Sequence, residues 1–164
     1  MPVEAIDWVL VQLRDEADPT MVIRTRAGLL MSDGYVKDLD GLTPITFSDL
    51  GDGMYFLTIQ HRNHLSVISD VAIEILAGQG IHDFTTGGAM GAEPMKLMSG
   101  GAYALWCGDL NADGVIDAGD RSIAWNMRNQ TGYLQADATM DGVVDASERS
   151  VTWNNRNKAS GLPQ

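Results

Sequence analysis

The chain has 164 residues, of which 45% are hydrophobic, and this is enough for one large or two small domains with a core. Its 22 acidic and 11 basic residues give a net charge of −11, which argues against a nucleic-acid partner because such a partner needs a basic face. The chain has no run of about 18 apolar residues and only one cysteine, Cys107, so neither membrane insertion nor an intrachain disulfide is expected.

The N-terminal part of the chain predicts a series of short strands. In the first run Val9, Val11 and Leu13 alternate with the residues between them, as in a half-buried strand. Asp-Gly pairs and other turn signals separate many of the runs. The predicted strands are residues 3–14, 20–27, 34–38, 43–48, 54–61, 71–76 and 81–85. This spacing predicts a mainly β fold in which residues 1–86 form an antiparallel β-sandwich.

A Gly- and Met-rich segment, 87–107, connects this domain to the rest of the chain. It is either a flexible linker or a strap packed between two modules. Its four large apolar residues favour the packed strap. They are Met90, Met95, Leu97 and Met98. Cys107 ends the segment and is expected to be a small buried hydrophobic residue, not a nucleophile.

Residues 109–120 (loop 1) and 137–148 (loop 2) have the spacing of calcium loops. Such a loop supplies oxygens from positions 1, 3, 5, 7, 9 and 12, with Gly at position 6 for a sharp turn. Gly114 and Gly142 stand at position 6. The predicted ligands are Asp109, Asn111, Asp113, the Val115 carbonyl, Asp117 and Asp120 in loop 1, and Asp137, Thr139, Asp141, the Val143 carbonyl, Asp145 and Glu148 in loop 2. The sequence therefore predicts two Ca²⁺ ions in a helical module at 108–164.

The two loops belong to one unit that occurs twice. Residues 109–129 and 137–157 are identical at 12 of 21 positions, with an offset of 28. A pair of Asx and Gly turns that bind no ion is the alternative, but it does not explain the repeated ligand spacing. Loop 1 is expected to bind more tightly, because Thr139 is a weaker ligand than Asn111, although Glu148 can compensate by binding through both oxygens.

Each loop is followed by a predicted helix with a tryptophan at the equivalent position, Trp125 and Trp153. One interpretation is that one or both pack on the β domain or on the other helix. The other is a symmetric aromatic surface for a partner, since Trp and Arg anchor interfaces and Arg128 and Arg156 lie nearby.

Catalytic chemistry is not expected. The chain has no Gly-x-Ser-x-Gly, His-Glu-x-x-His or phosphate-loop motif, so we predict that it is not an enzyme. His61 and His64 are spaced to begin a zinc site, but no third ligand is nearby in the sequence. Hydrogen-bonded or exposed histidines are the simpler interpretation.

The Gly-Asp-x-Asn-x-Asp-Gly start at Gly108, the single following helix and the second copy resemble a dockerin module over 108–158. The resemblance implies two Ca²⁺ ions, a pseudo-twofold helix pair and docking onto a cohesin domain in extracellular assemblies. The helices differ from the Leu- and Lys-rich helices typical of dockerins, because they contain Trp, Asn and Arg instead.

Two further resemblances concern the rest of the chain. The pattern from Leu50 through Gly53 to Tyr55 is similar to the Leu-x-x-Gly-x-Tyr motif of transthyretin-like and carboxypeptidase-regulatory-like sandwiches. Segments 6–15, 61–65 and 104–106, with the loop pair, resemble C-terminal regions of secreted Bacteroidetes hemagglutinin-like surface proteins. That resemblance implies an extracellular, non-enzymatic sandwich with a calcium module. Residues 3–14 lack the basic start of a signal peptide, so the numbering is expected to begin near the mature end.

These observations predict a secreted, non-catalytic, calcium-binding structural protein, such as a self-assembling subunit of an extracellular filament or surface appendage. Its partner would be another copy of the chain or another extracellular protein. A dockerin-type anchor for a cohesin is one alternative. A carbohydrate-binding or adhesin module is another, with Trp8, Tyr35 and Tyr55 as the aromatic candidates.

Overall fold

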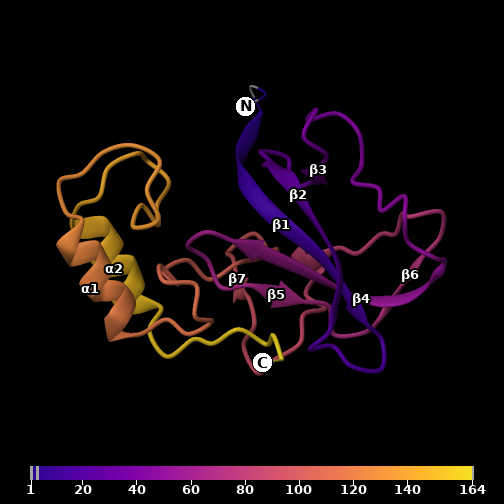
Figure 1. Cartoon of the computed structure of the whole chain (residues 1–164). Helices are drawn as coiled ribbons and strands as arrows, with labels where there is room; N and C mark the ends of the chain where they lie inside the picture. The colour runs from indigo at the N-terminus through magenta and orange to yellow at the C-terminus, as the bar shows by residue number, and fades with distance from the viewer. Residues whose placement is uncertain (1, 3, 164) are drawn as a thin grey trace.

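The computed structural model describes residue 2 and residues 4–163. A six-stranded antiparallel sheet has the order β3-β2-β1-β4-β5, and β6 also pairs with β4 (Figure 1). Its strands are β1 (Ala5–Asp15), β2 (Val22–Met31), β3 (Val36–Lys37), β4 (Gly53–His61), β5 (Val67–Ile68) and β6 (Ile73–Ile75). A two-stranded sheet follows, made of β7 (Lys96–Leu97) and β8 (Tyr103–Ala104). The helices are α1 (Ala118–Asn126) and α2 (Ala146–Asn154).

The alternation in β1 decides which face of the sheet is buried. Val9, Val11 and Leu13 are buried and form one core cluster with Phe47 and Ile75. Because side chains of a strand alternate between two faces, the neighbouring residues of β1 point the other way. On that face Ile6, Trp8 and Leu10 are 42–44% exposed. The predicted fold class, mainly β with a small helical module after it, is confirmed.

Several predicted strands differ from the structure. Residues 43–48 form only a single bridge between Pro44 and Lys37, because proline has no N–H to donate to a ladder. Residues 81–85 are not a strand. A short 3-10 helix, η1 (Phe84–Thr86), begins there because the Asp83 side chain accepts a hydrogen bond from the Thr85 N–H. Val3, the start of the first predicted strand, lies outside the described residues.

The connecting segment 87–107 contains β7 and β8, neither of which was predicted. Met95 is buried, whereas Leu97 and Met98 are 59% and 46% exposed. The segment is joined to the sheet by an isolated bridge between Ala89 and Ser69. Among the described helices, none is long and apolar enough to cross a membrane.

The helical module has pseudo-twofold pairing between its two halves. Ile116 of loop 1 exchanges main-chain hydrogen bonds with residues 157–158, which follow α2. Val144 of loop 2 makes the equivalent bonds with residues 129–130, which follow α1. The buried side chains Leu110, Ala124, Ala136, Ala138 and Val144 form its core, and α1 and α2 pack side by side at one end of the molecule (Figure 1). Each half therefore closes the loop of the other.

Candidate metal centre, helix surface and junction

Both loops have the local conformation that a calcium loop requires. Gly114 and Gly142 at position 6 have φ of 86° and 85°, a region in which a side chain is strained. The residue at position 9 caps the helix that follows each loop. Asp117 accepts a hydrogen bond from the Gly119 N–H at the start of α1, and Asp145 accepts one from the Ser147 N–H at the start of α2. Each loop thus ends in a capping box that fixes position 12 at the start of its helix.

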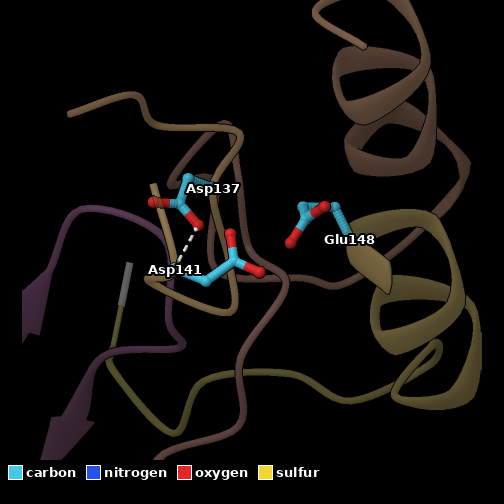
Figure 2. A group of neighbouring side chains, drawn as sticks. All are labelled: Asp137, Asp141 and Glu148. Carbon is cyan, nitrogen blue, oxygen red and sulfur yellow. Dashed lines mark hydrogen bonds between the residues drawn. The ribbon is translucent and has the colours of Figure 1, made fainter. Parts of the chain in front are cut away.

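Loop 2 brings three carboxylates together. Oxygens of Asp137, Asp141 and Glu148 all lie within 4.8 Å of one another, and they point into one space (Figure 2). Two oxygens bound to one Ca²⁺ at 2.3–2.6 Å are at most about 5 Å apart, so this group fits one ion. Glu148 is fully buried, and Asp137 is 2% exposed. Like charges at this separation repel one another, and a bound cation would relieve that repulsion.

The remaining loop 2 positions surround this group. The Thr139 hydroxyl donates to Glu148 Oε1 at 2.8 Å, so it is engaged by another ligand of the loop. Asp145 is exposed, and Ser147 Oγ and N–H donate to its Oδ1 at 2.5 and 2.6 Å. The main-chain N–H of Val143 donates a hydrogen bond to the Asp141 carboxylate. That the Thr139 hydroxyl is a weaker calcium ligand than Asn111 remains a prediction.

Loop 1 is arranged differently at position 12. Asp120 is fully buried, but its oxygens accept N–H bonds from Leu110, Asn111 and Asp117 at 2.7–3.2 Å. Among the described residues, no three carboxylates of loop 1 bring their oxygens as close together as Asp137, Asp141 and Glu148 do in loop 2. Aspartate is one methylene shorter than glutamate, so Asp120 stays nearer to the backbone of its loop.

The electrostatics of loop 1 nevertheless favour a cation. Burial, together with the nearby charges of Asp120 and Asp113, raises the pKa of Asp109 to about 6. Asn111 Oδ1 accepts a hydrogen bond from the Asp113 N–H at 3.2 Å, which holds its amide in the loop. Asp117 and Val115 lie at the exposed rim. The residues of both loops therefore fit Ca²⁺, with loop 2 the more closely preformed.

The two tryptophans lie on the helix surface. Trp125 is 52% exposed and Trp153 is 47% exposed, so neither is a core residue. Each ring is contacted by one arginine from its own helix unit and one from the other. The centroid distances are 4.6 Å for Arg128 and 5.0 Å for Arg149 at Trp125, and 4.2 Å for Arg156 and 4.9 Å for Arg121 at Trp153. We call these two stacks the Arg–Trp–Arg surface. Equivalent residues of the two stacks are 28 residues apart in the chain, which is the offset of the sequence repeat.

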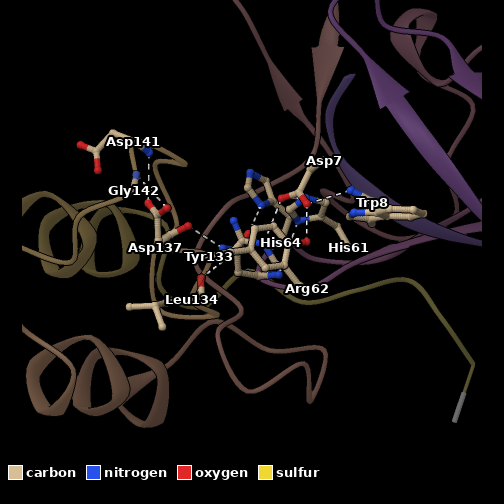
Figure 3. A network of polar contacts seen from close by, with 11 residues as sticks. Asp7, Trp8, His61, Arg62, His64, Tyr133, Leu134, Asp137, Asp141 and Gly142 are labelled. Carbon is tan, nitrogen blue, oxygen red and sulfur yellow. Dashed lines mark hydrogen bonds and ion pairs between the residues drawn. The ribbon is translucent and has the colours of Figure 1, made fainter. Parts of the chain in front are cut away.

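A polar junction joins the sheet to the helical module, with Asp7 buried at its centre and Tyr133, which is 61% exposed, at its edge (Figure 3). Asp7, 1% exposed, accepts hydrogen bonds from Tyr133 Oη at 2.5 Å, Trp8 N–H at 2.7 Å and Arg62 Nε at 2.9 Å. Burial alone would raise the pKa of Asp7, but these bonds outweigh it and lower that pKa. Burial and the Asp7 carboxylate in turn raise the pKa of Tyr133 to about 12.

Sequence reasoning did not identify this junction. His61 Nε2 lies 3.1 Å from Asp7, and His64 Nδ1 lies 2.7 Å from Asn63 Oδ1, so both histidines have hydrogen-bond partners. In the described part of the chain neither belongs to a group of three possible metal ligands. A signal was present in Asp7, a charged residue within the apolar first half of β1, but the side chains that it contacts are 54–126 residues away.

No family model and no curated protein matches the chain. Its fold is similar to chains in crystal structures of an N-terminal and a C-terminal interface mutant of a type II cohesin–X–dockerin complex from Acetivibrio cellulolyticus. The TM-scores are 0.53 and 0.54, at 17% and 16% identity, over 92% of this chain and 81% of those chains. The chain therefore has the mainly β fold, with a small helical part, that these cohesin–X–dockerin structures contain.

Proposed function

We propose that this protein is an extracellular, non-catalytic assembly module whose two calcium loops hold a pair of helices in position for docking onto a partner protein. The observation that carries the proposal is the Arg–Trp–Arg surface. Trp and Arg are the residues that most often dominate protein interfaces, and here they are duplicated and exposed on a helix pair. Calcium would supply the charge neutralisation that the loop carboxylates need.

Two observations support a proposed partner class. The similar structures are of complexes between a cohesin and an X–dockerin unit, and the dockerin resemblance of 108–158 points to the same kind of partner. We therefore propose a cohesin-type domain as the partner. Four arginines on the Arg–Trp–Arg surface favour a partner face that carries carboxylates, because complementary charge fixes orientation and accelerates association.

Binding of purified type I and type II cohesins, measured by calorimetry with calcium and with chelator, tests the proposal. We expect calcium-dependent binding that Trp125→Ala/Trp153→Ala reduces by at least about thirtyfold, since an interface hot spot contributes about 2 kcal/mol or more. Trp8→Ala is the matched control, because Trp8 is 42% exposed but lies on the sheet. Equal losses in both variants would contradict the assigned surface.

Self-assembly into an extracellular filament is the second candidate. The observation that favours it is the row of exposed apolar residues on β1, namely Ile6, Trp8 and Leu10. Sizing and negative-stain imaging distinguish the two candidates. Calcium-dependent polymers that Trp8→Ala abolishes would favour the filament, whereas a monomer that binds cohesin would favour docking. A monomer that binds no cohesin with or without calcium would exclude both.

A further inference from the structure

Asn63 connects the sheet to both calcium loops. It directly follows Arg62 after β4 and is fully buried. Its side-chain nitrogen donates to the main-chain oxygen of Asp137 at 2.6 Å, and its own main-chain oxygen accepts from Gly108 N–H at 2.9 Å. A buried amide keeps such bonds because an unpaired polar group destabilises the folded state. Asn63 therefore links the sheet to the residue before loop 1 and to the first residue of loop 2.

The segment 133–137, which leads into loop 2, makes three bonds with the sheet. Tyr133 Oη donates to Asp7, and Arg62 donates to the Leu134 carbonyl. The third is the bond from Asn63 to Asp137. The Arg62 guanidinium also lies 4.2 Å from the centre of the Tyr133 ring, and Figure 3 shows these residues facing one another between the two parts of the molecule.

Asp137 belongs to both the junction and the predicted ion site. Its carbonyl accepts from Asn63, while its carboxylate accepts the N–H groups of Asp141 and Gly142 and lies within 4.8 Å of the Asp141 and Glu148 oxygens. Without a cation these carboxylates repel one another and drive loop 2 open. Opening displaces Asp137 and with it the end of segment 133–137.

Loop 1 is attached to the sheet in another way. Gly108 precedes it directly in the chain and bonds to the main chain of Asn63, and Cys107 forms a bridge with His64. These are main-chain contacts made before the first ligand, Asp109. A further link runs from inside loop 1 through Ser160, whose N–H donates to the Gly114 carbonyl and whose hydroxyl donates to the Ser66 carbonyl. None of these contacts uses a residue that supplies a carboxylate ligand, whereas Asp137 of loop 2 takes part in the junction itself.

We propose that the ion in loop 2, and not the ion in loop 1, locks the helical module onto the sheet through Asn63, Tyr133 and Arg62. Calcium then controls the orientation of the Arg–Trp–Arg surface relative to the β domain as well as the folding of the helices. This inference rests on the part of the proposed function that places Ca²⁺ in loop 2, and it is independent of which partner is bound.

Hydrogen exchange of the full chain, followed by mass spectrometry with calcium and with chelator, tests the lock. Calcium should slow exchange in peptides covering 5–9 and 61–64 by about tenfold, which corresponds to one net hydrogen bond of about 1.4 kcal/mol. Asp141→Ala should abolish this effect on the sheet side. Asp113→Ala, the equivalent change in loop 1, should leave it intact. Equal behaviour of the two variants would overturn the proposal.

Junction variants keep the test decisive if Asp141→Ala does not fold. Asn63→Ala and Tyr133→Phe should still take up calcium in loop 2 by calorimetry but should lose the calcium-linked protection of 5–9. Tyr35→Phe, at a 69% exposed tyrosine, is the control and should retain it. Calcium uptake with full protection in Asn63→Ala would overturn the lock alone. No calcium uptake by the unmodified protein would overturn the proposed function as well.

Discussion

At the residue scale, position 3 distinguishes the two calcium loops. Asn111 offers an amide oxygen, whereas the Thr139 hydroxyl donates to Glu148 and is a poor ligand. Loop 2 has the more closely preformed carboxylates, but loop 1 has one more strong ligand. We expect the additional ligand to dominate, because a flexible loop 1 can close around the ion, while binding through both Glu148 oxygens compensates only in part for the weak Thr139 hydroxyl.

Exchanging the residues at position 3 tests this comparison. Thr139→Asn should strengthen calcium binding by loop 2, and Asn111→Thr should weaken binding by loop 1, each by about tenfold. Calorimetry on the two variants and the unmodified protein measures both sites. The interpretation is wrong if Thr139→Asn leaves both dissociation constants unchanged.

The buried histidines make the junction sensitive to acid. Burial, with the nearby charges of His61 and Arg62 opposed by Asp7, lowers the pKa of His64 to about 3, and burial also lowers that of His61. These two histidines therefore bind fewer protons in the folded protein than in the unfolded chain as the pH falls below 6.5. Their contribution to stability is fully present above pH 6.5 and is lost as the pH falls toward 3, by up to about 1.4 kcal/mol per pH unit for one histidine.

Chemical denaturation across this pH range checks the prediction. His64→Gln keeps a side chain that can bond to Asn63 but does not titrate. Its free energy of unfolding should therefore decrease less steeply between pH 6.5 and 4 than that of the unmodified protein. Parallel profiles for the two proteins would show that His64 does not contribute.

At the element scale, the helices α1 and α2 combine two different faces. Ile123, Met127 and Val151 pack on the core of the helical module, while the tryptophans face solvent between arginines. The arginine partners across the helix pair were not predicted, because Arg121 and Arg149 reach the tryptophan of the opposite repeat.

Removal of both tryptophans should therefore have a small effect on folding. A buried Trp replaced by Ala costs about 3–5 kcal/mol, but exposed cation–π contacts contribute only about 0.5–1 kcal/mol each. We expect Trp125→Ala/Trp153→Ala to destabilise the helical module by about 2–4 kcal/mol in thermal melts with calcium, because the double variant loses four such contacts. A loss near the roughly 6–10 kcal/mol expected for two core tryptophans would assign these residues to packing.

At the scale of the whole molecule, calcium and the junction together decide whether the two parts unfold as one. The loops contain eight predicted carboxylate ligands that repel one another without an ion. Chelation should lower the melting temperature of the helical module more than that of the sheet, whose core cluster is separate. Calorimetric scans with and without chelator measure this, and identical scans would contradict metal-coupled folding.

The sequence by itself determined the calcium-loop candidates, the repeat, the buried face of β1 and the mainly β class, because each of these depends on residues close together in the chain. Ligand spacing, a glycine with positive φ and alternation are local properties. Tertiary structure alone decided the junction, since Asp7 meets Arg62 and Tyr133 only after the sheet and the helical module have packed. It also decided the short strands β5, β7 and β8, whose two-residue ladders depend on their partners. Long-range contacts of single residues leave no periodic pattern, and for that reason the sequence points to the calcium-loop candidates but not to the contacts that join them to the sheet.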